Sequence, residues 1–131
     1  MAMFMPWAAK AQETLTVYDG TNSTLTTNSQ VPMYGNYFDD YTKSEFVIPA
    51  AQLTEMENAE ISALKFYISS VGSYGSGWSG THQVVFLKEV ESASLSDFSG
   101  MDGATVVFDD TFEEPASNAT EFEIAFTTNY E

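Results

Sequence analysis

Apolar and polar residues alternate along several short segments of this chain. Residues 62–68 alternate, with Leu64, Phe66 and Ile68 on one face of an extended chain. A period of two is typical of a strand with one buried face. The pattern recurs at residues 121–126, and the apolar run at 84–87 is rich in β-forming residues. These segments predict three strands.

Further strands are predicted on both sides of this central part. Residues 13–18 alternate and run into an Asp-Gly turn, and residues 42–48 alternate up to Pro49. Residues 104–108 form another β-rich run, followed by an extended exit at 111–115. Six or seven strands separated by turns indicate an all-β chain, an antiparallel β-sandwich of jelly-roll type.

Only one short helix is predicted, near residues 50–57. It begins after Pro49, and Leu53 and Met56, three positions apart, give it one apolar stripe. A similarly spaced apolar pair within residues 92–103 predicts a single helical turn that ends at a glycine.

The charge is strongly negative. The chain of 131 residues has nineteen Asp and Glu against four Lys, and its formal net charge is −15. Such a surface repels phosphate backbones and anionic lipids, so we expect no nucleic-acid partner. The absence of Cys excludes disulfides and Cys-ligated metal centres.

The first residues differ from the rest of the chain. Ala9 and Ala11 fit the small-x-small pattern of a signal-peptidase site, with cleavage before Gln12. We interpret residues 1–11 as a residual secretory signal and 12–131 as a single domain, so the protein is expected to be secreted or at the cell surface. A disordered N-terminus is the alternative. No membrane span is expected, because spanning needs about 20 apolar residues.

Candidate catalytic groups are few. His82 is the only histidine, and no nucleophile-elbow motif accompanies it. Paired carboxylates occur at residues 39–40, 109–110 and 113–114. Neighbours on a strand point to opposite faces, which argues against the paired acids of a glycosidase. We expect a non-catalytic protein without a cofactor, with a structural calcium at these carboxylates as an open alternative.

Aromatic side chains in loops are the candidate binding residues. Trp78 and Tyr74 lie in a Gly/Ser-rich segment, and Tyr37 and Tyr41 lie in an earlier aromatic segment with Tyr34. Large, rigid rings favour stacking on sugars or anchoring a protein partner. The alternative is that these rings fold back over one end of the sandwich.

Four segments of the chain carry a family resemblance: residues 34–49, 61–67, 85–90 and 103–108. Together they resemble the jelly-roll modules at the N-termini of large secreted or surface proteins of Bacteroides and Prevotella type bacteria, similar to the cleaved-adhesin and choice-of-anchor families. Members continue past the position of Tyr130 with further strands, and further domains usually follow. The resemblance therefore implies a C-terminally incomplete sandwich attached to downstream domains of a parent chain.

Three functions are compatible with these features. The first is a non-catalytic exported or cell-surface module for adhesion, whose partner is a glycan or a host or cell-surface protein. The second is an accessory N-terminal domain of a secreted peptidase or glycoside hydrolase. The third is a structural spacer or a fimbrial-type subunit.

Overall fold

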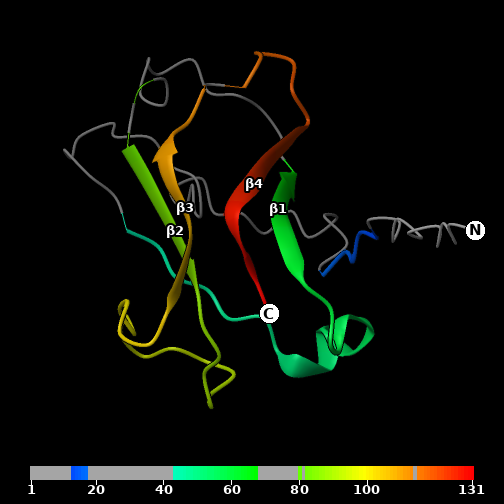
Figure 1. Cartoon of the computed structure of the whole chain (residues 1–131), viewed down its shortest axis with the longest axis vertical. Coiled ribbons are helices and arrows are strands. Elements are labelled where there is room, and N and C mark those ends of the chain that lie inside the picture. Colours follow the sequence, from blue (N-terminus) through cyan, green and yellow to red (C-terminus); the bar gives the residue numbers. More distant parts are fainter. Residues whose placement is uncertain (1–12, 18–42, 68–79, 81, 114) are drawn as a thin grey trace, which may run out of the picture.

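A computed structural model describes residues 13–17, 43–67, 80, 82–113 and 115–131 of the chain. Within these residues the chain forms four strands and two short 3-10 turns (Figure 1). The strands are β1 (Ile61–Tyr67), β2 (His82–Leu87), β3 (Thr105–Thr111) and β4 (Glu121–Tyr130). The described part of the chain is thus rich in β-structure with almost no helix, as the alternating pattern predicted.

The four strands pair antiparallel in two sheets of two strands. β1 pairs with β4, which lies far along the chain, whereas β2 pairs with the next strand, β3. In β1 the exposed Lys65 and Tyr67 alternate with the less exposed Leu64 and Phe66. The period of two therefore predicted correctly which face of β1 is turned inward.

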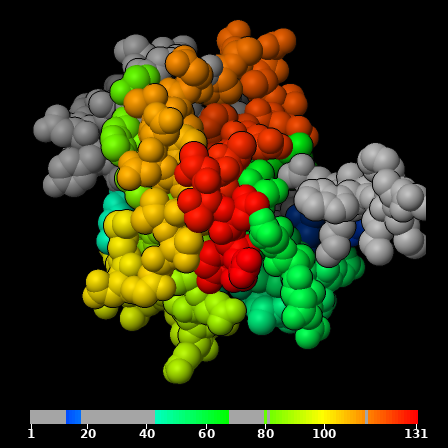
Figure 2. Space-filling model, in the orientation of Figure 1, coloured from blue at the N-terminus to red at the C-terminus, as the bar shows by residue number. Residues whose placement is uncertain are grey.

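The two sheets meet along β3 and β4. Figure 1 shows these two strands side by side, with β2 and β1 on their outer sides, and Figure 2 shows β4 (red) between β3 (orange) and β1 (green). The Thr127 hydroxyl on β4 donates a hydrogen bond to the Val107 carbonyl on β3, at 3.2 Å. This bond joins the two sheets directly.

The core lies at this junction, which we call the β3–β4 seam. Val107, Phe112 and Ile124 are its buried residues. The Phe112 ring stacks on Phe108, with centroids 4.7 Å apart, and meets Phe122 edge to face at 5.1 Å. Burial of these aliphatic and aromatic side chains is the main apolar stabilisation of the described structure.

Two predicted strands do not appear among the residues that the structure describes. Residues 13–17 and 43–48, the described portions of the predicted strands at 13–18 and 42–48, are not in a strand. An alternating segment can place its apolar side chains on one face of a sheet. A strand also needs a neighbouring strand with which to form a hydrogen-bonded ladder. With four strands in its described part, the chain shows antiparallel sheets but not the sandwich or jelly-roll arrangement.

The predicted helix near residues 50–57 is two separate 3-10 turns, η1 (Ala50–Gln52) and η2 (Thr54–Met56). Each is closed by bonds between residues three apart, such as Met56 N–H to the Leu53 carbonyl at 2.9 Å. Leu53, with φ of −109°, interrupts the helical path between them. Nucleating an α-helix is unfavourable, because the backbone angles of several residues are fixed while only one hydrogen bond forms. A segment this short therefore forms 3-10 turns.

The predicted signal segment at 1–11 lies outside the described residues. Among the residues that are described, no helix is long and apolar enough to cross a bilayer.

Candidate interaction site

The connection between β2 and β3 is unusually long for two paired strands. It covers residues 88–104, which we call the β2–β3 loop. Two residues suffice to join antiparallel neighbours. Connections longer than about 12–15 residues without regular structure are uncommon in compact domains, and those that are ordered are usually functional. The length of the loop therefore makes it a candidate site.

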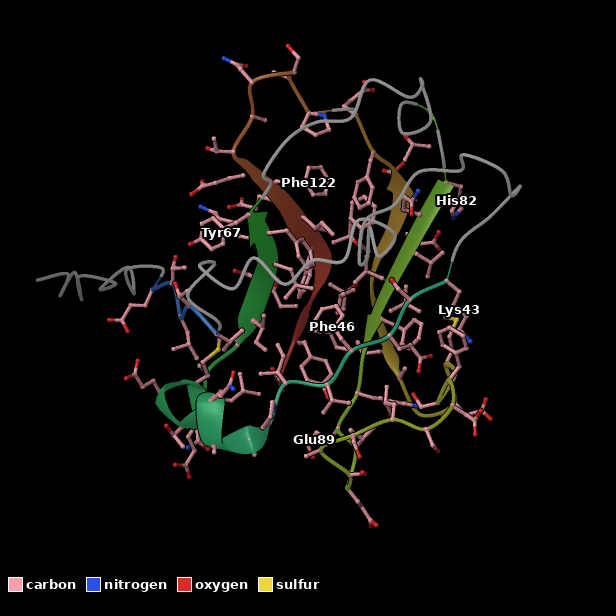
Figure 3. The ribbon with its side chains drawn as sticks, turned by 180° about the vertical axis from the view of Figure 1, so that it is seen from behind. Lys43, Phe46, Tyr67, His82, Glu89 and Phe122 are labelled. Carbon is pink, nitrogen blue, oxygen red and sulfur yellow. The ribbon has the colours of Figure 1, made fainter. Side chains whose placement is uncertain are left out.

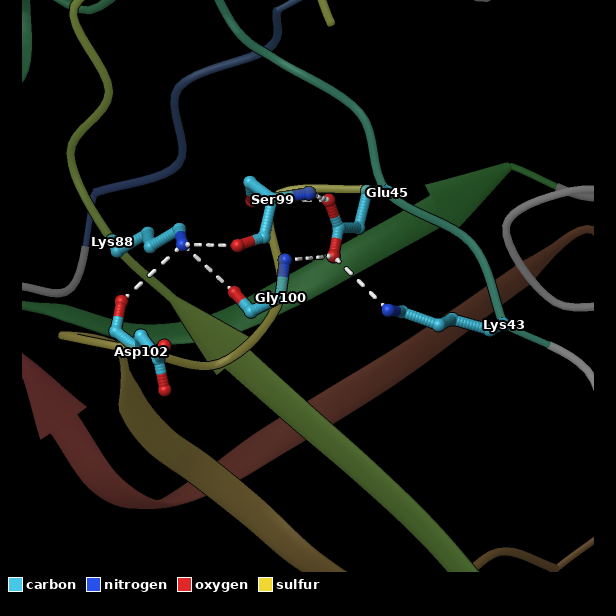
Figure 4. Close-up of polar contacts among 6 residues, drawn as sticks. All are labelled: Lys43, Glu45, Lys88, Ser99, Gly100 and Asp102. Carbon is cyan, nitrogen blue, oxygen red and sulfur yellow. Dashed lines mark hydrogen bonds and ion pairs between the residues drawn. The ribbon is translucent and has the colours of Figure 1, made fainter. Parts of the chain in front are cut away.

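A carboxylate distant in sequence binds the backbone of this loop (Figure 4). Oε2 of Glu45 accepts hydrogen bonds from the Ser99 backbone N–H at 2.6 Å and from the Ser99 hydroxyl at 3.0 Å. Oε1 accepts from the Gly100 N–H at 3.1 Å. Gly100 has φ of +71°, a conformation that costs a glycine little. One side chain thus satisfies two successive backbone donors.

Glu45 is held in its charged form by these contacts. Its side chain is only 8% exposed. Burial raises the pKa of the Glu45 carboxyl, but the hydrogen bonds from Ser99 and Gly100 outweigh this effect. The Lys43 ammonium, 3.8 Å from Oε1, lowers the pKa further. The net pKa lies below its ordinary value of 4.5.

An ammonium group binds the carbonyl oxygens of the same loop. The Lys88 Nζ donates to the carbonyls of Ser99 at 3.2 Å, Gly100 at 2.8 Å and Asp102 at 3.3 Å (Figure 4). An ammonium has three protons, so its donors match these three acceptors in number. Glu45 and Lys88 together form what we call the Glu45–Lys88 clamp, which binds loop donors with one charge and loop acceptors with the other.

Lys43 connects the clamp to an exposed ring. Its Nζ lies 4.4 Å from the centroid of Phe98, in the loop, and also forms the ion pair with Glu45. A cation over an aromatic face is attracted by the quadrupole of the ring. The Phe98 ring therefore has a contact of its own, next to the backbone held by the clamp.

The loop exposes apolar side chains that a monomer normally buries. The exposed fractions are 57% for Phe98, 49% for Met101, 40% for Val90 and 37% for Leu95. Single exposed apolar residues are ordinary, but several within one connection are typical of a contact surface for another molecule. We call these four side chains the apolar loop residues.

The helical turn predicted within residues 92–103 is absent from the structure. The Ser92 hydroxyl donates to the Ser94 carbonyl at 2.7 Å, and its oxygen accepts from the Ser94 N–H at 3.2 Å. Such local side-chain bonds compete with the backbone bonds of a helix. The three-residue spacing of Leu95 and Phe98 therefore does not mark a buried stripe, since both side chains are exposed.

The aromatic binding residues predicted from sequence, Trp78, Tyr74, Tyr37 and Tyr41, lie outside the described residues. The β2–β3 loop was missed by sequence reasoning. Its signal was present: a long segment between two β-rich runs, with apolar residues that follow neither a strand nor a helix period.

His82 is described, and it belongs to a different part of the molecule. Its Nε2 lies 2.6 Å from Oδ1 of Asp109 on the neighbouring strand, and both side chains are well exposed. Figure 3 places His82 and Glu89 at opposite ends of β2, so the pair is remote from the loop. Among the residues described, no three His, Asp or Glu side chains are grouped so as to hold a metal ion.

No family model, curated protein or solved structure matches this chain. The resemblance to jelly-roll surface modules therefore stays a prediction.

Proposed function

We propose that this chain is a non-catalytic, exported or cell-surface β-sandwich module that binds a protein partner through its β2–β3 loop. The observation that carries the proposal is the combination of two features in one connection. The Glu45–Lys88 clamp fixes the loop backbone, and the apolar loop residues extend from that backbone into solvent.

A fixed loop is better suited to binding than a mobile one. Ordering a residue costs about 1–2 kcal/mol of backbone conformational entropy, and a mobile loop loses that free energy when it binds. The clamp orders this backbone during folding, so the loop loses less conformational entropy when it binds a partner. Burial of the apolar loop residues against a partner then contributes to affinity with little opposing entropy.

The proposal assigns no chemical step to His82. Its side chain and that of Asp109 form an exposed cross-strand pair, whereas a general base works best in a site that excludes water. We interpret the contact as a surface interaction between two neighbouring strands.

The test is binding of the full chain to an array of glycans and to an array of extracellular and cell-surface proteins. The informative variant is the double substitution F98S/M101S, which removes apolar surface without changing the charge. Its matched control is Y67S, because Tyr67 is equally exposed but lies on β1.

We expect a bound protein that is lost with F98S/M101S and retained with Y67S. Retention by both variants would exclude the loop as the site. Binding only to glycans, lost in a W78A/Y74A variant and retained in F98S/M101S, would favour the aromatic residues predicted from sequence instead.

A further inference from the structure

We infer that the β2–β3 loop recognises a basic protein surface, one that offers an apolar pocket surrounded by Lys or Arg. This inference rests on the proposed function and adds the chemistry of the partner. It rests on a difference between the charged side chains in and near the loop. The acidic side chains are exposed to solvent, whereas the lysines are in contact with other groups of the chain.

The acidic side chains of the loop all face solvent. Four exposed carboxylate residues are interspersed with the apolar loop residues along the connection: Glu89, Glu91, Asp97 and Asp102. A partner that covers the apolar side chains must also approach these carboxylates. A neutral or acidic partner would desolvate them without compensation, whereas Lys or Arg at the edge of its pocket would pair with them.

The two lysines described next to the loop are already occupied. Lys88 donates to three loop carbonyls, and Lys43 contacts both Glu45 and the Phe98 ring. Neither ammonium is therefore available to neutralise the exposed carboxylates. The loop presents negative charge around its apolar side chains, on a chain whose formal net charge is −15.

The overall charge also disfavours other occupants. A second copy of the chain would bring the same negative charge to the contact, and like charges oppose association. A basic partner is attracted over long distances, which raises its association rate and makes that rate sensitive to salt. The same carboxylates would contribute little to recognition of an uncharged sugar.

The test uses three synthetic peptides of equal length and the full chain. The first combines lysines with leucine and phenylalanine, the second replaces its apolar residues by serine, and the third replaces its lysines by glutamate. Affinity is measured by calorimetry, and the contact is located by backbone amide shifts in NMR. We expect the first peptide to bind at least tenfold tighter than the other two, with shifts concentrated in residues 88–104.

Two charge variants distinguish binding by the loop carboxylates from attraction by the overall negative charge of the protein. The first removes the four exposed loop carboxylates: E89Q/E91Q/D97N/D102N. The second removes the same number of charges elsewhere: E13Q/E55Q/E57Q/E131Q. We expect the loop variant to bind the lysine-rich apolar peptide at least tenfold more weakly than the control variant, and F98S/M101S to be weakened similarly.

Three results of the peptide experiments would overturn the inference. They are equal binding of the glutamate peptide, equal weakening by the two charge variants, and no binding of any peptide. A concentration-dependent dimer that F98S/M101S dissociates would also overturn it, in favour of a second copy as the occupant. If the arrays reveal a loop-dependent partner with an acidic or neutral surface, the inference fails while the proposed function stands; without any loop-dependent partner, the proposed function itself fails.

Discussion

The β3–β4 seam and the β2–β3 loop are held in place by different forces. At the seam, Val107 and Ile124 are buried, and the Phe112 ring lies between two further rings. In the loop, charged side chains bind the backbone, and the apolar side chains are exposed. Hydrophobic burial is non-directional, whereas hydrogen bonds to a charged group fix a particular backbone geometry. The seam therefore stabilises the fold, and the clamp determines the shape of one loop.

The largest expected effect is at the seam. Replacing Ile124 with Ala should lower the free energy of unfolding by about 3 kcal/mol, because it leaves a cavity in a packed interior. Urea denaturation of the variant measures this loss. I124V should cost about 1 kcal/mol. L95A, in the loop, should change stability by less than about 0.5 kcal/mol. Similar losses for I124A and L95A would contradict the distinction between the two regions.

The next largest effect is in the clamp. K88M keeps much of the aliphatic stem but removes the donor for three carbonyls, and we expect it to cost about 1–2 kcal/mol of unfolding free energy. The fold should persist, because the seam is unchanged, while amide exchange of residues 99–102 accelerates. Intact amide protection in K88M would show that the loop is ordered by other contacts.

The pH dependence of stability should contain a contribution from Glu45. Its pKa in the folded chain is lowered, so its stabilisation is complete above the unfolded-chain value near 4.5 and is lost as the pH falls through the folded value. Other carboxylates titrate as well, so the relevant quantity is the difference between wild type and E45Q. This difference should shrink below pH 4.5, and a difference independent of pH would refute the role of the charge.

A smaller effect than that of the clamp is expected on the exposed face of β1. Lys65 lies 3.5 Å from Glu121 and 3.7 Å from Glu123 across the β1–β4 pair. Exposed ion pairs of this kind contribute about 0.2–1 kcal/mol. K65M should therefore destabilise the chain less than K88M, and high salt should reduce its effect. A larger loss for K65M than for K88M would reverse the ranking of the two lysines.

The strands at the seam were predictable from local sequence. The alternation of Phe122, Ile124 and Phe126 predicted which side of β4 is less exposed, and the structure confirms it. The pairing of β1 with β4 was not predictable, because alternation defines a face and not a partner. The same limit explains the predicted strand at 42–48, whose pattern fits a sheet that its described residues do not join.

The clamp could not be predicted, because its parts are far apart in sequence and individually ordinary. Glu45 lies between Ser44 and Phe46, and nothing nearby indicates that its carboxylate binds the backbone at Ser99. Side-chain bonds to a backbone depend on the path of both segments, which hydrophobic periodicity does not encode. The helical turn predicted from the spacing of Leu95 and Phe98 is absent for a related reason, because apolar spacing does not encode the local side-chain bonds between Ser92 and Ser94.

Amide hydrogen exchange at Ser99 and Gly100 tests the central claim most directly. In the full wild-type chain near neutral pH we expect both amides to exchange far more slowly than in an unstructured peptide, and E45A to remove most of this protection while leaving that of β3 and β4 intact. Exchange of both amides at the unstructured rate in wild type would contradict a loop shaped in advance for a partner.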